Sequence, residues 1–516
     1  MVAFVLVVAA GVALRGEGHD PLVRTLPLSV VLLAVKTAPG AGSGGDNVVA
    51  AGNDGNTGRV YVLDARNGQT LRSVAVPGLV TPGGDVGNSF SLLVLDARHE
   101  RAVVTSFTFT NGAATASYVS VIDTRRGALV HTIVARTSPV GLATATLDTS
   151  EDRRLGGHIF VANSVNTNDP RGHSYKDSVS VIRTQDGAVE RQFLAGHGVT
   201  AVAVDGRTRH VFIVTQRQDS QTNEPIGPSS VWTLDTATWR ALSVVAVGQD
   251  AAPPVVDERT GRLFVYSYAG QSPYDGRVDV VDTRRGKLVR TTTVGIAPRA
   301  LAVDDAPRTG ASGGYVFVLN SGYDRSGSVS ILDGRSGALA RTVAVQGAAF
   351  AMALDKTRDH LFIYSGVNGG GANGSSRVSM MDARTGSLLS ATSVGANPVA
   401  LALDARDARL FVVTTGTVDP NRGDAPLGDG RVDVLDTRTG RLLRTLSVGV
   451  APGAVAVDER VERLYAATRG GLVTTQAPDP WGWLPSWLRR RLPFLPSGGT
   501  RTRIVPPGVS VLDLTR

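Results

Sequence analysis

The chain carries the stretch Val-Asp-Val-Leu-Asp-Thr-Arg-Thr-Gly-Arg-Leu-Leu-Arg-Thr-Leu-Ser-Val-Gly-Val-Ala-Pro-Gly-Ala-Val-Ala-Val-Asp at 432–458, and related stretches recur along the sequence. In each copy an apolar run ends in Asp, a short turn and a second run follow, and a third run ends in Asp. The two Asp positions are 22 residues apart in five copies, from Asp235 and Asp257 to Asp436 and Asp458. Such a repeat indicates one supersecondary unit used many times.

Each repeat contains four short runs that alternate between apolar and polar residues or are wholly apolar. In one unit they lie at 300–303, 316–319, 329–332 and 339–345, separated by turns rich in Gly, Asp and Thr. Alternation rich in Val, Thr and Leu predicts β-strands. Four antiparallel strands per unit, repeated around a ring, would bury both faces of every sheet and leave few edges. The sequence therefore predicts an all-β fold, a single β-propeller of four-stranded blades.

The number of repeats follows from the run that opens each unit. These opening runs lie at 30–35, 92–95, 143–147, 201–204, 253–256, 300–303, 351–354, 400–403 and 454–457. We therefore count nine repeats, with eight as the alternative because propellers commonly have about four to eight blades. The first unit is the weakest, since Lys36 occupies the place that we assign to its Asp.

The two ends of the repeat region complement each other. The last unit reaches Arg516 without a fourth strand, whereas residues 22–28 have the pattern of a fourth strand with no unit before them. We predict that 22–28 pair with 509–512 and close the ring. Such closure would leave no unpaired edge at the seam.

Three stretches also carry a family resemblance. They are Val-Ser-Val-Ile-Asp-Thr-Arg-Arg-Gly at 119–127, Ala-Leu-Ala-Val-Asp at 300–304 and Arg-Leu-Phe-Val-Tyr at 262–266. They resemble the repeats of YVTN-type β-propeller proteins, and the resemblance covers the chain from about residue 22 onward. It implies the propeller fold and a bacterial secreted or cell-surface protein. It implies no single activity, because related propellers include lactonases and lyases.

Composition agrees with one long repeat domain. The chain has 516 residues, 60 Gly, 5% aromatic residues and a mean hydropathy of +0.03, which suits one large core and is too polar for a bundle of membrane spans. We assign residues 22–516 to the propeller. The absence of Cys excludes disulfides, thiol nucleophiles and Cys-liganded zinc.

The net charge of +8 comes almost wholly from arginine, since Lys36, Lys176, Lys287 and Lys356 are the lysines among 53 basic residues. Arginine binds phosphate well, which raises the possibility of a nucleic-acid partner. However, the arginines recur in the turns between third and fourth strands and are spread around the ring. Because no basic stripe with interleaved aromatic residues occurs, we predict no nucleic-acid binding.

The N-terminal segment 1–21 begins with an unbroken apolar run over residues 1–14. This run has the length of a signal-peptide core, and Gly11 and Ala13 supply small residues for cleavage. It lacks a basic start, and a buried strand is the alternative because its end stands nearly in the repeat register. We predict an export signal and an extracytoplasmic protein.

Most residues that could carry chemistry have a structural explanation. An Asp that ends a strand can accept hydrogen bonds from the backbone of the following turn, so we assign the repeated Asp residues to turns. His158, His210 and His360 precede equivalent strands of different units and should not converge on a metal. Asp419, Asn421 and Asp424 only partly match a calcium loop. His197 remains a candidate binding residue, because it lies in a loop near the expected mouth of the central channel.

The loops indicate where binding occurs. Connections between second and third strands are long and varied, and long loops on a rigid scaffold are usual binding sites. The longest contains a Pro-, Trp- and Arg-rich insertion at 478–497, which either covers one end of the ring or contacts a partner or membrane. Its candidate binding residues are Trp481, Trp483, Trp487, Arg489, Arg490 and Arg491.

These patterns together predict an exported monomeric propeller that binds a protein, glycan or membrane-surface ligand through its long-loop face, without catalysis, cofactor or metal. The alternative is a propeller-type hydrolase or lyase, similar to lactonases, with a metal held by His and carboxylates at the channel mouth. A third possibility is an interaction scaffold that takes no small ligand.

Overall fold

The computed structural model describes residues 22–27, 31–38, 47–54, 57–65, 69–80, 93–96, 99–110, 113–135, 143–147, 158–163, 177–196, 198–217, 226–269, 275–304, 314–322, 326–366, 376–415, 418–419, 425–426, 429–458, 462–468, 471–476, 500–505 and 508–513. Every regular element among these residues is a β-strand. They form nine four-stranded sheets and two two-stranded ribbons. Within these ranges no helix is long and apolar enough to cross a bilayer.

The sheets of the first half follow one another along the chain. The first contains β2 (Val31–Ala38), β3 (Asn47–Asp54), β4 (Thr57–Asp64) and β5 (Thr70–Val76). The second contains β6 (Leu93–Asp96), β7 (Arg101–Thr110), β8 (Ala113–Asp123) and β9 (Ala128–Ala135). The third contains β10 (Ala143–Leu147), β11 (His158–Asn163), β12 (Asp177–Arg183) and β13 (Val189–Gly196). The fourth contains β14 (Val199–Asp205), β15 (His210–Thr215), β16 (Ser230–Asp235) and β17 (Arg240–Ala246).

The next four sheets repeat this arrangement. They contain β18 (Val255–Asp257), β19 (Arg262–Tyr268), β20 (Gly276–Asp282) and β21 (Lys287–Thr293), then β22 (Pro298–Val303), β23 (Tyr315–Asn320), β24 (Ser326–Asp333) and β25 (Leu339–Gln346). After these come β26 (Ala348–Asp355), β27 (His360–Gly366), β28 (Ser376–Asp382) and β29 (Leu388–Val394). The eighth sheet contains β30 (Pro398–Asp404), β31 (Arg409–Thr414), β34 (Arg431–Asp436) and β35 (Leu442–Ser447).

The ninth sheet joins strands from both ends of the chain. It contains β36 (Pro452–Asp458), β37 (Arg463–Thr468), β40 (Gly508–Asp513) and β1 (Leu22–Pro27), with β1 outermost. Strand β1 pairs antiparallel with β40, from Leu22 opposite Leu512 to Pro27 opposite Gly508. The ribbons are β32 (Val418–Asp419) with β33 (Ala425–Pro426), and β38 (Gly471–Gln476) with β39 (Thr500–Val505).

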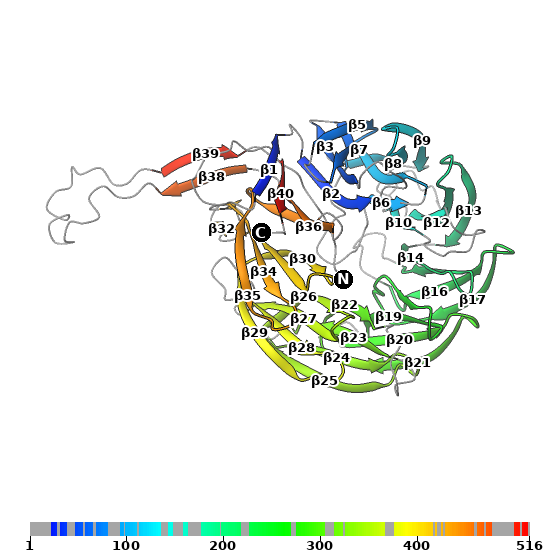
Figure 1. Cartoon of the computed structure of the whole chain (residues 1–516). Helices are drawn as coiled ribbons and strands as arrows, with labels where there is room; N and C mark the ends of the chain where they lie inside the picture. Colours follow the sequence, from blue (N-terminus) through cyan, green and yellow to red (C-terminus); the bar gives the residue numbers. More distant parts are fainter. Residues whose placement is uncertain are drawn as a thin grey trace.

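The sheets surround a common axis like the blades of a propeller, with the first strand of each innermost (Figure 1). Each innermost strand contacts the innermost strand of the next blade, in the order β2, β6, β10, β14, β18, β22, β26, β30 and β36, and β36 contacts β2. These inner strands are rich in Ala and Val, because small side chains suit strands that crowd around an axis.

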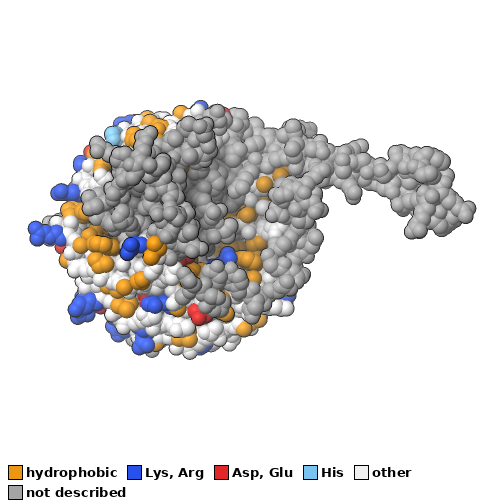
Figure 2. Space-filling view, turned by 180° about the vertical axis from the view of Figure 1, so that it is seen from behind, with side chains coloured by type: hydrophobic (Ala, Val, Ile, Leu, Met, Phe, Trp, Pro, Cys, Tyr) orange, Lys and Arg blue, Asp and Glu red, His pale blue; other side chains and the backbone are white. Residues whose placement is uncertain are grey.

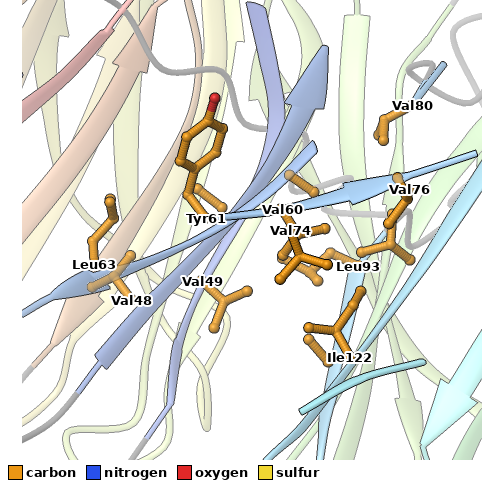
Figure 3. Close-up of a cluster of buried hydrophobic side chains, with 14 of the residues drawn as sticks. Val48, Val49, Val60, Tyr61, Leu63, Val74, Val76, Val80, Leu93 and Ile122 are labelled. Atoms are coloured by element: carbon orange, nitrogen blue, oxygen red, sulfur yellow. The ribbon is translucent and has the colours of Figure 1, made fainter. Parts of the chain in front are cut away.

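The hydrophobic core lies between adjacent blades. Seven of the nine second strands place a large aromatic side chain there, and Phe160, Phe212, Phe264, Phe317, Phe362, Phe411 and Tyr465 are fully buried. Figure 3 shows one cluster, in which Val49, Tyr61 and Val74 of the first blade pack with Leu93 and Ile122 of the second. Tyr465 of the ninth blade belongs to the same cluster, and its hydroxyl donates to the carbonyl of Ala65.

The predicted strands agree closely with the structure in the most regular unit, where the runs at 300–303, 316–319, 329–332 and 339–345 lie within β22 to β25. The assignment of Lys36 to the Asp position is wrong. A bulge shifts the register of β2 between Leu32 and Ala34, so Ala38 lies opposite Asn47. That is the position at which Asp404 lies opposite Arg409 in the eighth blade.

Candidate binding face

The antiparallel strand order gives the disc two different faces. Connections from first to second strands and from third to fourth strands lie at one end of the strands, which we call the turn face. Connections from second to third strands and from each blade to the next lie at the opposite end, which we call the loop face. The ribbons β32–β33 and β38–β39 belong to second-to-third connections, so they arise from the loop face.

Asp side chains hold the connections of the turn face. Oδ1 of Asp282 accepts hydrogen bonds from the backbone N–H groups of Arg284 and Arg285, at 3.0 and 2.9 Å. Oδ1 of Asp257 accepts equivalent bonds from Arg259 and Thr260. This geometry confirms the turn assignment for the repeated Asp residues, since a carboxylate that accepts backbone bonds serves the turn.

These contacts change the acidity of the turn carboxyls. Burial alone would raise the pKa of Asp282, but the N–H donors of Arg285 and Arg284 outweigh it and the pKa is lowered. The pKa of Asp333 is lowered by the same balance of burial against the Ser336 donors. Asp404 is the exception, because burial raises its pKa more than the N–H of Asp407 lowers it.

The histidines before the second strands also have structural partners. Nδ1 of His210 lies 2.6 Å from the carbonyl of Thr283 in the next blade, and Nδ1 of His360 lies 2.7 Å from the carbonyl of Thr437. Nε2 of His158 lies 2.8 Å from Glu190. They do not converge, and among the described residues no group of three His, Asp or Glu side chains could hold a metal ion.

Sequence reasoning missed two buried carboxylates that support the loop face. Asp279 is fully buried and accepts hydrogen bonds from the Gly248 backbone, the Arg277 guanidinium and the Thr291 hydroxyl. Asp433 accepts equivalent bonds from the backbone of Gly395 and from Thr445. Both glycines end the preceding blade, so each Asp fixes an inter-blade connection. The sequence could have predicted these buried carboxylates, because an acidic residue stands inside an apolar third strand, as in Arg-Val-Asp-Val at 277–280.

A β-bulge recurs at the loop-face end of the inner strands, and the bulged residue differs in type from blade to blade. The register shifts around Thr200, Arg299, Phe350 and Val399, which are equivalent positions five residues before the strand-ending Asp. Their side chains are all exposed or partly exposed. We call these four residues the rim. An Ala follows each of these positions, while the position itself changes in size and charge, as expected for a variable surface on a repeat scaffold.

Two rim residues from neighbouring blades lie together. The Arg299 guanidinium is 5.9 Å from the centre of the Phe350 ring, a cation–π distance. The Tyr266 hydroxyl donates to the Arg299 carbonyl at 2.8 Å. Close by, surrounding protein displaces water from the Asp250 carboxyl and raises its pKa, although solvent still reaches the side chain. The rim therefore combines a cation with an aromatic face, and Tyr266, which binds the Arg299 backbone, also interacts electrostatically with Asp250.

A hollow of about 660 Å³ lies between the inner strands β14 and β18. The side chains along it are apolar from Val202 to Val204 and from Pro253 to Val256, whereas backbone groups and the charged Glu258 and Arg259 at its turn-face end make its surface partly polar. Pro253 and Pro254 lack a backbone N–H and lie directly before β18, which has only three residues.

The candidate residues predicted from sequence lie outside the described residues. These are His197, Trp481, Trp483, Trp487, Arg489, Arg490 and Arg491. The structure does show how the insertion is attached. Strands β38 and β39 form a ribbon that projects sideways from the ring (Figure 1), and the 478–497 segment lies between them in sequence. The alternation Thr-Arg-Thr-Arg-Ile-Val at 500–505 could have predicted β39.

Comparison with known proteins identifies the fold. No protein-family profile matches the chain, and no curated protein matches it. Among solved structures, one described as a eukaryotic initiation factor is 12% identical, with 87% of this chain and 97% of that chain covered and a TM-score of 0.54. The dihydro-heme d1 dehydrogenase NirN in complex with DHE is 11% identical, covering 86% and 78%, with a TM-score of 0.50. Sqt1 of Saccharomyces cerevisiae is 12% identical, covering 80% and 93%, with a TM-score of 0.46.

The chain is a β-propeller. Since 1077 solved chains match, the likeness identifies a widespread fold and selects no single function among its members.

Proposed function

We propose that this propeller is a binding module whose ligand contacts the loop face around the rim. The observation that carries the proposal is the rim itself, where Arg299 and Phe350 from two blades meet and solvent reaches both side chains. Arg and aromatic residues dominate binding energy at protein interfaces, which favours a protein partner. The long second-to-third connections add surface around this centre.

The scaffold for this site is a closed ring of nine blades with β1 as its latch. Contact between β36 and β2, the β1–β40 pairing and the Tyr465 hydrogen bond across the seam support closure. A closed ring holds the rim residues in fixed relative positions, so little conformational entropy is lost on binding.

The protein acts outside the cytoplasm as a monomer and belongs with the YVTN-type propellers. The repeat motifs and the apolar segment 1–14 support this placement. No metal or cofactor takes part in the proposed binding.

The proposal is tested by comparing two variants for binding to extracellular proteins and to a glycan array. Arg299→Ala with Phe350→Ala removes the rim pair, whereas Arg384→Ala with Arg438→Ala changes two exposed arginines on the turn face. We expect the rim variant to lose binding at least about tenfold while the turn-face variant retains it. Equal binding by both variants would contradict the proposal, as would metal-dependent hydrolysis of lactones by the purified protein.

A further inference from the structure

Exposed aliphatic side chains gather on the outermost strands, on the perimeter of the disc. Examples from the fifth, seventh and eighth blades are Leu288 and Val289 of β21, Leu388 and Leu389 of β29, and Leu442 and Leu443 of β35. Their exposed fractions run from 43% for Leu288 to 61% for Leu388. Each pair lies at the very start of its strand, directly after the turn from the third strand, so these side chains lie close to the turn face.

Arginines occupy the turns directly beside these aliphatic residues. Exposed fractions of the side chains run from 61% for Arg384 to 80% for Arg126, and Arg125, Arg285 and Arg438 fall between them. In the described third-to-fourth turns and outer strands the acidic side chains are Asp186 and Glu190. The first-to-second turns nearer the axis carry charges of both signs. Figure 2 shows basic side chains protruding at the periphery with hydrophobic ones beside them.

The turn arginines remain available for a further partner. Arg384 reaches Asp359 at 3.6 Å, and Arg438 reaches Asp436 at 3.8 Å. Exposed pairs at such distances contribute little energy, so a stronger anionic partner can compete for the guanidinium groups.

We propose that the turn face and the adjoining perimeter bind an anionic lipid bilayer. The described third-to-fourth turns are of similar length and all lie at the same end of the strands, so their arginines share one face of the disc, which suits the broad surface of a bilayer. The aliphatic residues lie one or two positions beyond the turn, or about 3–7 Å at the rise of a β-strand. That depth is similar to the roughly 5–10 Å at which apolar side chains enter the headgroup and acyl boundary.

The presence of exposed aliphatic residues directly beside the turn arginines favours a bilayer over other anionic partners. Nucleic acid would use the arginines and leave the aliphatic groups in water, whereas a bilayer takes up both. In this orientation the loop face points away from the membrane. The bound propeller would then present its rim to partners in solution.

The experiment is co-sedimentation of the full chain with vesicles of phosphatidylcholine alone and of equal parts phosphatidylcholine and phosphatidylglycerol. We expect binding to the anionic vesicles only, weakening as salt is raised. Arg384→Glu with Arg438→Glu should lower the partition coefficient at least about tenfold. The matched control is Arg217→Glu with Arg377→Glu, which makes the same change in net charge on the loop face outside the rim and should bind nearly as well as the parent chain.

A second variant tests the apolar contribution. Leu388→Ser with Leu389→Ser should weaken vesicle binding at every salt concentration, while circular dichroism and melting temperature confirm that the ring is folded. Equal losses in the turn-face and loop-face charge variants would overturn the proposal. The proposal is also overturned if the parent chain does not bind vesicles, or if it binds duplex DNA in a mobility-shift assay but no vesicles. It is likewise overturned if deletion of residues 478–497 alone abolishes vesicle binding. None of these results bears on ligand binding at the rim.

Discussion

At the residue scale, equivalent carboxylates differ in what their second oxygen contacts. Oδ2 of Asp355 accepts hydrogen bonds from the Thr437 hydroxyl and the Arg358 guanidinium, both at 3.0 Å. Oδ2 of Asp404 is buried without a hydrogen-bond partner in the described structure. At the same repeat position, the second carboxylate oxygen therefore has hydrogen-bond partners in one blade and none in the next.

We expect Asp355→Asn to destabilise the protein by about 2 kcal/mol, because hydrogen bonds to a charged acceptor contribute about 1.5–3 kcal/mol. Asp404→Asn should cost less than about 0.5 kcal/mol or stabilise slightly, since it removes a buried charge with a raised pKa. Urea unfolding of both variants measures the difference. Equal destabilisation would show that the partners of the second oxygen do not matter.

The same carboxyls predict the pH dependence of stability. The folded-state pKa values of Asp282, Asp333 and Asp382 are lowered, so their contribution is present above the unfolded value of about 4 and is lost as pH falls through the folded values. The raised pKa of Asp404 acts oppositely, and its contribution is lost as pH rises through the folded value. The urea concentration at the unfolding midpoint should therefore decrease as the pH is lowered below about 4. The Asp404→Asn variant should show a steeper decrease, because it lacks the opposing contribution of Asp404. A flat profile would contradict the turn assignment.

At the scale of the strand and its connection, Gly248, which follows the fourth strand β17, packs against the next blade. A Cβ on Gly248 would lie 2.2 Å from the Ser267 hydroxyl and 2.7 Å from the Tyr268 carbonyl. Its N–H must also stay within reach of Asp279. The connection is consequently as constrained as the strands that it joins.

We expect Gly248→Ala to destabilise the protein by about 1–3 kcal/mol through overpacking and loss of the Asp279 contact. Gly227→Asn is the matched control, because a Cβ there meets nothing within 4 Å and Asn tolerates its φ of +67°. Thermal and urea unfolding compare the two. Tolerance of Ala at 248 would show that adjacent blades move apart easily.

At the scale of the whole molecule, the proposed closed ring relies on pairing between chain segments that are distant in sequence. Strand β1 supplies the outermost strand of the ninth blade and covers the edge of β40. Removing it would expose the edge of β40 and the backbone groups that the ladder satisfies.

Deletion of residues 1–28 should therefore destabilise the protein by about 3 kcal/mol or more, since each backbone hydrogen bond contributes about 1 kcal/mol. Deletion of residues 1–14 alone should leave the unfolding transition unchanged. The measurement is melting temperature together with light scattering, which detects association through the exposed edge. Identical behaviour of the two deletions would argue against the latch.

Deletion of residues 478–497 should leave a folded ring, because shortening a loop changes its closure entropy little and β38 and β39 can be joined by a short turn. Circular dichroism and melting temperature test the fold. Global unfolding would show that the Trp-rich segment belongs to the core.

The sequence by itself determined the strands and the turns, because these depend on residues close together in the chain, and the regular recurrence of that local unit indicated a propeller. Period-two alternation is local, and so are the hydrogen bonds that a strand-ending Asp accepts from the N–H groups two and three residues later. Only the tertiary structure decided that Ala38 ends β2, that Asp279 fixes Gly248, and that Arg299 meets Phe350. Those outcomes depend on bulges, on the rotation between blades and on side chains from different repeats. No local pattern encodes such contacts, because packing across the ring selects them.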